Sequence, residues 1–185
     1  MLTQLTSFAT IGLRSERITV EVGLASGEGK IFIVGLGDMA VQESKQRVMM
    51  ALRSCGYRGS TGKTVTVNLA PADLRKSGPR FDLPIALALI LTNGSVKIPE
   101  ERLQSMAFLG ELALDGSLRH VTGVLSATIA CAKQGIKTIV VPEVNGPEAA
   151  LIPGVEVIAV KHLNELIDIL RDDAPVPSIT APASA

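Results

Sequence analysis

A glycine-proline turn leads into a long apolar run in the stretch Leu74-Arg75-Lys76-Ser77-Gly78-Pro79-Arg80-Phe81-Asp82-Leu83-Pro84. Aspartate is a favoured helix cap and proline is tolerated in a first turn, so a helix is predicted to begin near Asp82 and to end at Asn93-Gly94. Its apolar part, residues 83–91, is far shorter than the roughly 20 residues needed to cross a bilayer. We therefore predict a buried helix, with Asp82 as its cap.

Strand and helix patterns alternate on both sides of this helix. Residues 17–23 alternate between apolar and polar side chains, and 30–34 and 63–69 are short β-branched runs, which predicts three strands. Between the last two, apolar residues recur at helical spacing over 38–55, with Asp38 as N-cap and Gly56 as C-cap. Later patterns predict strands at 107–114 and 138–141, and helices at 121–133 and 163–170. The alternation indicates a two-layer α/β domain.

Composition limits the classes of function. The chain has 185 residues, with 18 basic and 18 acidic side chains and a formal net charge of zero. Bulk electrostatic attraction to nucleic acid or to an anionic membrane is therefore excluded, and any DNA contact must be a local patch. We predict one domain over residues 1–171, followed by a linker or tail rich in Pro, Ala and Ser over 172–185.

The start of the chain, residues 1–7, lacks the basic and apolar segments of a signal peptide. We therefore expect a cytoplasmic protein with no membrane partner. Cys55 and Cys131 should remain reduced there, and we expect both to be small core residues.

The glycine-rich run Gly59-Ser60-Thr61-Gly62-Lys63-Thr64 invites comparison with a phosphate-binding loop. A Walker loop needs glycine five positions before its Gly-Lys pair, and Tyr57 stands there. The run also precedes a strand, whereas phosphate is cradled at the start of a helix. We predict a turn and no nucleotide site.

Metal and carboxylate chemistry have weak support. His120 and His162 are far apart in the sequence and neither belongs to a ligand cluster, so no metal site is predicted. Asp82, Glu111 and Asp115 could form a carboxylate site, but a helix cap for Asp82 and a turn role for Asp115 explain these residues without a ligand. Arg80 is a candidate ion-pair partner for one of these acids.

Two groups of basic residues are candidates for contact with DNA phosphates, which needs only charge and reach. The alternative for both groups is an ordinary solvated surface. The first group is a loop and the second lies on the predicted 38–55 helix and its exit: Arg75, Lys76 and Arg80, then Arg47, Arg53 and Arg58.

Four stretches, in order along most of residues 1–170, are similar to those of one protein family. They are Ile33-Val34-Gly35-Leu36-Gly37-Asp38 with Glu43-Ser44, Val67-Asn68-Leu69-Ala70-Pro71-Ala72-Asp73-Leu74, Arg80-Phe81-Asp82-Leu83-Pro84-Ile85-Ala86-Leu87, and Phe108-Leu109-Gly110-Glu111-Leu112 with Leu114-Asp115-Gly116. Together they resemble the N-terminal domain of the ComM/YifB family, bacterial AAA+ proteins often labelled magnesium-chelatase-like. The matching signature positions include Asp38, Glu43, Asn68, Asp73, Asp82, Pro84, Glu111 and Asp115.

This domain is itself similar to the proteolytic domain of Lon protease, which implies a mixed sheet with helices packed on one face. Lon presents its catalytic serine in a Gly-Pro-x turn, and x is Arg80 here. Gap-free pairing puts Leu125 at the partner lysine, so the resemblance implies that the serine-lysine dyad is absent. Ser77 and Ser126 are the displaced candidates for a nucleophile. Three turn positions depart from the usual proline of the family: Gly37, Arg75 and His120.

The resemblance implies a non-catalytic accessory domain of a ring-forming, ATP-driven DNA motor of the kind associated with branch migration in natural transformation. Its expected partners are its own ATPase domain, beyond residue 185, and neighbouring subunits, in a homo-oligomer expected to be a hexamer, with DNA as a further candidate. ATP and Mg are expected only in that ATPase domain. The alternatives are a divergent Lon-type peptidase using Ser77 or Ser126, and a chelatase-like accessory module.

Overall fold

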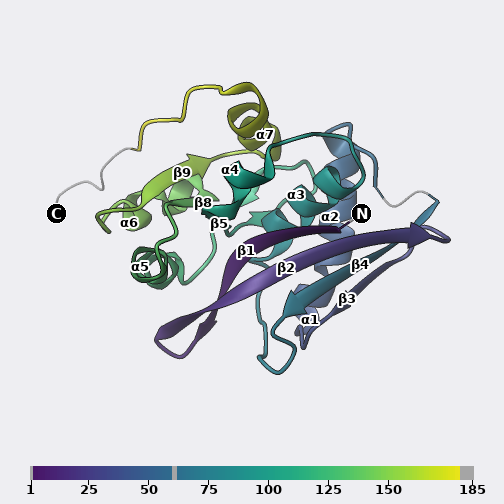
Figure 1. The fold of residues 1–185 in the computed structure, drawn as a ribbon, viewed down its shortest axis with the longest axis horizontal. Coiled ribbons are helices and arrows are strands. Elements are labelled where there is room, and N and C mark those ends of the chain that lie inside the picture. The colour runs from purple at the N-terminus through teal and green to yellow at the C-terminus, as the bar shows by residue number, and fades with distance from the viewer. Residues whose placement is uncertain (1, 60–61, 180–185) are drawn as a thin grey trace.

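A seven-stranded mixed sheet forms the centre of the molecule in a computed structural model, which describes residues 2–59 and 62–179 (Figure 1). Strands β1, β2 and β4 pair antiparallel, whereas β3 pairs parallel with β4, and β1, β5, β8 and β9 run parallel. In sheet order the strands are β3 (Ile31–Val34), β4 (Lys63–Ala70), β2 (Arg14–Ser26), β1 (Leu2–Ile11), β5 (Met106–Phe108), β8 (Thr138–Pro142) and β9 (Glu156–Val160).

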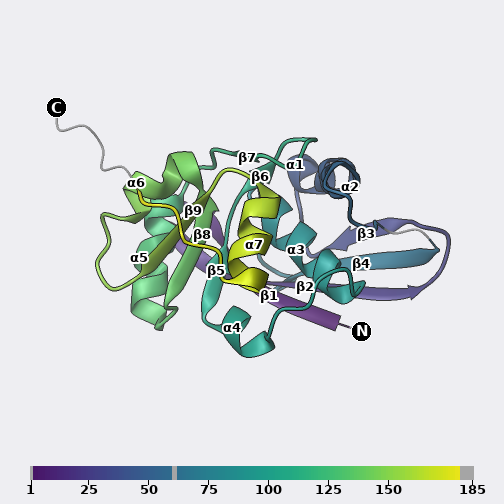
Figure 2. The ribbon, with the colours of Figure 1, turned by 90° about the horizontal axis from the view of Figure 1, so that it is seen from above.

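The helices cover both faces of this sheet. They are α1 (Met39–Gln42), α2 (Ser44–Ser54), α3 (Asp82–Thr92), α4 (Glu100–Gln104), α5 (Val124–Gln134), the 3₁₀ helix η1 (Glu143–Asn145), α6 (Gly146–Ala149) and α7 (Leu163–Asp172). Figure 1 shows α7 above β8 and β9 and α5 below them. Figure 2 shows α3 running beneath α7 across the middle of the domain.

The side chains of β8 are buried on both faces of the sheet, so helices on one face alone could not cover them. Val140 belongs to the larger apolar core, whereas Ile139 and Val141 belong to a second core that includes α5 residues such as Ala127 and Cys131. Strands buried on both faces need cover on both faces, as is typical of parallel sheets. The predicted mixed sheet is confirmed. The expectation that the helices lie on one face is wrong for the C-terminal strands.

The buried helix predicted from Asp82 is confirmed as α3, and all but one of its eleven residues are buried. A helix that is apolar on every side must be surrounded by protein. It lies in the larger core, against β1 and β2 on one side and α2 on another. Pro84 occupies its first turn, as expected.

Most other predicted elements are confirmed with shifted bounds. The 38–55 helix divides at Glu43 into α1 and α2, and the 107–114 strand divides into β5 and the short β6 (Glu111–Leu112). β6 pairs with β7 (Leu118–Arg119) in a separate two-stranded sheet. The long β1 was not predicted from the sequence. Among the described residues, no helix is both long and apolar enough to cross a membrane.

Candidate functional site

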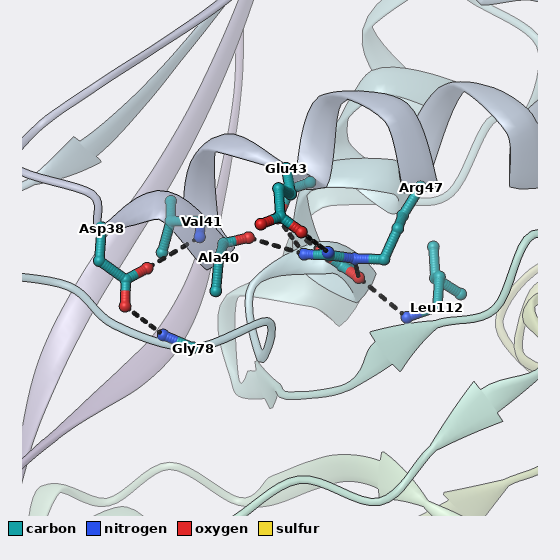
Figure 3. A network of polar contacts seen from close by, with 9 residues as sticks. Asp38, Ala40, Val41, Glu43, Arg47, Gly78 and Leu112 are labelled. Atoms are coloured by element: carbon teal, nitrogen blue, oxygen red, sulfur yellow. Dashed lines mark hydrogen bonds and ion pairs between the residues drawn. The ribbon is translucent and has the colours of Figure 1, made fainter.

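The carboxylate of Asp82 lies fully buried at the start of α3. Figure 3 shows the polar network that includes Arg47 and Leu112, which come from two other segments. Ser44 Oγ donates to its Oδ1 at 2.5 Å, Arg47 Nε donates to Oδ2 at 2.6 Å, and the Leu112 backbone amide donates to Oδ2 at 3.0 Å. The helix cap is Phe81, without a side-chain cap bond. The prediction that Asp82 caps α3 is therefore wrong, because its oxygens bond to α2 and β6 instead.

The Arg47 side chain forms hydrogen bonds within this network instead of extending into solvent. Its side chain is 17% exposed and also donates from Nη2 to the Ala40 carbonyl at 2.8 Å. Glu43, one turn earlier, lies 3.7 Å from its Nη1. Arg47 donates to both oxygens of the buried Asp82 carboxylate, and such bidentate, charge-assisted hydrogen bonds are stronger than neutral ones.

Burial and the hydrogen bonds between Asp82 and Arg47 change the pKa values of both groups. Burial raises the pKa of the Asp82 carboxyl, and the bonds from Arg47, Ser44 and the Leu112 amide counteract that rise. The hydrogen bond with Asp82 raises the pKa of the Arg47 guanidinium, against the effect of its own burial. We take the pair as ionised at neutral pH, because the carboxylate receives four donated bonds and arginine does not lose its proton.

Asp38 ties the same region to the glycine-proline turn. Its Oδ1 accepts from the Val41 amide at 2.9 Å, which confirms it as the N-cap of α1. Its Oδ2 accepts from the Gly78 amide at 3.2 Å. The Asp38 carboxylate therefore hydrogen-bonds both to the first turn of α1 and to Gly78, two residues before Arg80.

Arg80 is 6% exposed and has no acidic partner among the ion pairs of the described residues. Its Nη1 donates to Thr10 Oγ1 at 2.6 Å and its Nη2 to Thr122 Oγ1 at 3.2 Å, while Nε has no partner. Burial lowers the pKa of this guanidinium. The prediction that Arg80 pairs with an acid is wrong, because its side chain points to the threonine hydroxyls and not to the Asp82 network.

The predicted basic loop exposes only one of its three cations. Lys76 is fully buried with its Nζ donating to the Pro71 carbonyl, and burial lowers the pKa of its amine although Asp73 opposes this. Arg75 is exposed. The expectation of a three-cation exposed loop is therefore wrong, since Lys76 and Arg80 are both in the interior.

Serine-lysine chemistry has no support in the described hydrogen bonds, none of which joins a serine hydroxyl to a lysine amine. Ser126 Oγ lies 2.9 Å from Ser15 Oγ, and Ser77 is exposed. Leu125, which the resemblance to Lon pairs with the catalytic lysine, is 38% exposed on α5. Within residues 2–59 and 62–179, no group of three metal-ligating side chains comes together.

Two other residues considered as possible ligands, Asp115 and His162, have local structural roles. Asp115 Oδ1 accepts from the Ser117 amide and hydroxyl, which confirms its turn role and lowers the pKa of its carboxyl. His162 caps α7, with its Nδ1 accepting from the Asn164 amide. Asn68 donates a hydrogen bond to Glu21. Glu111 is half-buried in β6, and Asp73 and His120 are exposed.

The cysteine and glycine-loop predictions have mixed outcomes. Cys131 is buried as expected, whereas Cys55 is half-buried against the larger core. The glycine-rich run lies partly outside the described residues, at 60 and 61, and Lys63 opens β4. Sequence reasoning missed the roles of Thr10 and Thr122. Thr10 lies on the unpredicted β1, so the sequence offered no reason to place it beside Arg80.

Comparison with known proteins places the chain in a family. The family model for subunit ChlI of Mg-chelatase matches residues 20–145. YifB of Escherichia coli is 39% identical over 163 residues, and the competence protein ComM of Haemophilus influenzae is 34% identical over 174. These alignments cover 88% and 94% of this chain but 31% and 33% of those proteins. The chain thus spans about a third of the length of these relatives.

A Lon protease of Elusimicrobium minutum is a more distant relative. It is 28% identical over 180 residues, which cover 89% of this chain and 20% of that protein. The match is consistent with the mixed α/β sheet. The chain therefore belongs to the magnesium-chelatase-like family of AAA+ proteins that includes YifB and ComM.

Proposed function

We propose that this chain is a non-catalytic Lon-like domain, serving as an accessory module of a ComM/YifB-type AAA+ motor. The observation that supports the proposal is the burial of Arg80 between Thr10 and Thr122, at the position to which the resemblance to Lon assigns the nucleophile. A guanidinium is not a nucleophile, and Leu125 cannot act as the base that serine activation needs. Ser126 bonds to another serine instead of a lysine.

The domain would contribute to ring assembly or DNA engagement in the parent protein. ATP and Mg would be bound by an ATPase domain elsewhere in the parent, and the motor would work in the cytoplasm as a hexamer. The relative ComM is named a competence protein, and the family resemblance associates such motors with DNA, so we favour a DNA-related role over a role in chelation.

Two assays test the proposal. The purified chain should hydrolyse neither ATP nor unfolded protein and should not react with a serine-directed fluorophosphonate probe. In the parent protein, deleting residues 1–171 should impair ring assembly, measured by analytical ultracentrifugation, or DNA binding. Turnover by the chain that vanished in Ser77→Ala or Ser126→Ala would refute the proposal in favour of a peptidase.

DNA contact, if the domain makes it, would fall to the exposed cations Arg53, Arg58 and Arg75. With no net charge, the isolated chain should bind DNA in or beyond the roughly 10⁻⁴ to 10⁻⁶ M range of non-specific binders, and more weakly as salt is added. Fluorescence anisotropy should show weaker binding when all three are changed to alanine. An unchanged affinity and salt slope would favour subunit contact as the role of the domain.

A further inference from the structure

The guanidinium of Arg80 lies against the N-terminal end of α5. A Cβ atom built on Gly123, the residue that precedes α5, would lie 3.0 Å from Arg80 Nη1 and 2.3 Å from Thr10 Oγ1. Glycine is therefore required there by this close approach as well as by its φ of +83°. A buried cation and the first turn of an eleven-residue helix are thus held side by side.

These two groups repel each other electrostatically. The N-terminus of a helix carries about half a positive charge, and its first amides have no partners within the helix. Gly123 offers no side chain to cap those amides. Arg80 adds a full positive charge that no acid balances among the described ion pairs, and its Nε lacks any partner. An anion placed here would satisfy both groups.

The threonine hydroxyls complete the surroundings that an anion needs. Thr10 and Thr122 accept hydrogen bonds from Arg80, and each keeps its own O–H to donate. Thr122 is exposed and Gly123 is half-buried, so this end of the group lies at the protein surface. The lowered pKa of Arg80, caused by burial, fits a cation that lacks its counter-charge.

Apolar side chains are exposed on α5 and on the hairpin tip that lies beside it. Leu125 and Ile129, one turn apart on α5, are each 38% exposed, and Leu13 at the tip of the β1–β2 hairpin is 98% exposed. Ser126 Oγ contacts Ser15 Oγ at 2.9 Å and the Leu13 carbonyl at 3.4 Å, which places the hairpin tip beside α5. Exposed apolar side chains on neighbouring segments, bordered by polar residues, are typical of protein interaction sites.

We propose that Arg80, Thr10, Thr122 and the N-terminus of α5 form a docking site for a partner polypeptide that inserts an aspartate or glutamate carboxylate between apolar residues. A carboxylate matches the arginine fork and the helix amides, and the apolar neighbours match Leu13, Leu125 and Ile129. Nucleic acid fits poorly, because its backbone needs a row of accessible cations and Arg80 is 6% exposed. The site would bind such a segment whether or not the domain assembles a ring.

Nuclear magnetic resonance can test this with the tripeptide N-acetyl-Leu-Asp-Leu-amide added to the full chain. We expect saturable shifts of the Val124 and Leu125 amides and of the Arg80 Nε–H signal. The matched peptide with asparagine in place of aspartate should bind at least about tenfold more weakly, since it loses a charge-assisted bond. Arg80→Gln should weaken binding of the aspartate peptide by a similar factor.

Two further variants keep the result interpretable. Thr122→Val changes an exposed side chain and should weaken binding several-fold even if Arg80→Gln proves unfolded. Lys133→Gln removes an exposed cation from the last turn of the same helix and should leave the affinity unchanged.

Any of three outcomes would overturn the proposal. The two peptides could bind equally well, or inorganic phosphate could bind as tightly as the aspartate peptide, which would leave an anion site with no preference for a peptide. In the third outcome, a single-stranded DNA oligonucleotide would shift these amides while the peptide did not.

Discussion

Replacing Asp82 with alanine should destabilise the domain far more than the loss of a helix cap would. The change leaves Arg47, with its side chain 17% exposed, without its carboxylate, and it leaves the Ser44 hydroxyl and the Leu112 amide without their acceptor. Removing one partner of a buried ion pair costs about 3–5 kcal/mol, whereas losing a cap costs about 0.5–2 kcal/mol. We expect a loss of unfolding free energy of about 3–5 kcal/mol.

Urea unfolding followed by circular dichroism measures this difference. With a slope of about 2 kcal/mol per molar urea, the midpoint should fall by roughly 1.5–2.5 M. Asp73→Ala, which removes an exposed carboxylate, is the control and should change stability by no more than about 0.5 kcal/mol.

A double-mutant cycle with Arg47→Met separates the pair from other effects. The double variant should be more stable than the sum of the single losses implies, by about 1–3 kcal/mol, because it leaves no unpaired charge. A loss below about 1 kcal/mol for Asp82→Ala, or additive losses in the cycle, would show that the Asp82–Arg47 ion pair does not stabilise the fold.

Three other perturbations test separate parts of the fold. Gly123→Ala should destabilise the domain more than Gly135→Ala. Both positions have a positive φ, but only a Cβ atom at 123 would clash with Thr10 and Arg80. Equal losses of about 1–2 kcal/mol in thermal unfolding would contradict this. Burial raises the pKa of the Cys131 thiol to about 12, so Ellman's reagent should label Cys131 only after unfolding, and rapid labelling of the native Cys55→Ser variant would contradict this. The unfolded thiol ionises first as pH rises, so stability contributed by Cys131 should be present below about pH 8.5 and lost towards pH 12; Cys131→Ala should remove this part of the pH dependence of urea unfolding.

The elements with strong local patterns could be predicted from the sequence. α3 was predicted from its apolar run, the cap at Asp38 from its position before a helical repeat, and the Asp115 turn from the turn preference of aspartate. Each of these signals acts between residues a few positions apart. β1 lacked a clear alternation, since Ser7, Phe8 and Ala9 are all buried in succession, and it was missed.

The burial of the cations was beyond sequence reasoning. Lys76 and Arg80 have the composition of a solvated basic loop, and nothing nearby in the sequence indicates that both are inside. Arg80 is stabilised by Thr10 and Thr122, which lie 70 and 42 positions away. Only the packing of α5 against β1 in the folded chain brings them together.

Residue identity, spacing and short-range backbone preferences were enough to predict the class of the fold and the family. The contacts of Asp82 and Arg80 depend instead on how distant segments pack in the folded chain. An aspartate at the start of a helix can cap it or bond elsewhere, and both roles suit the same residue type. The choice depends on Ser44 and Arg47, 38 and 35 positions away, which the folded chain places beside its buried carboxylate, where an unpaired charge would cost several kcal/mol.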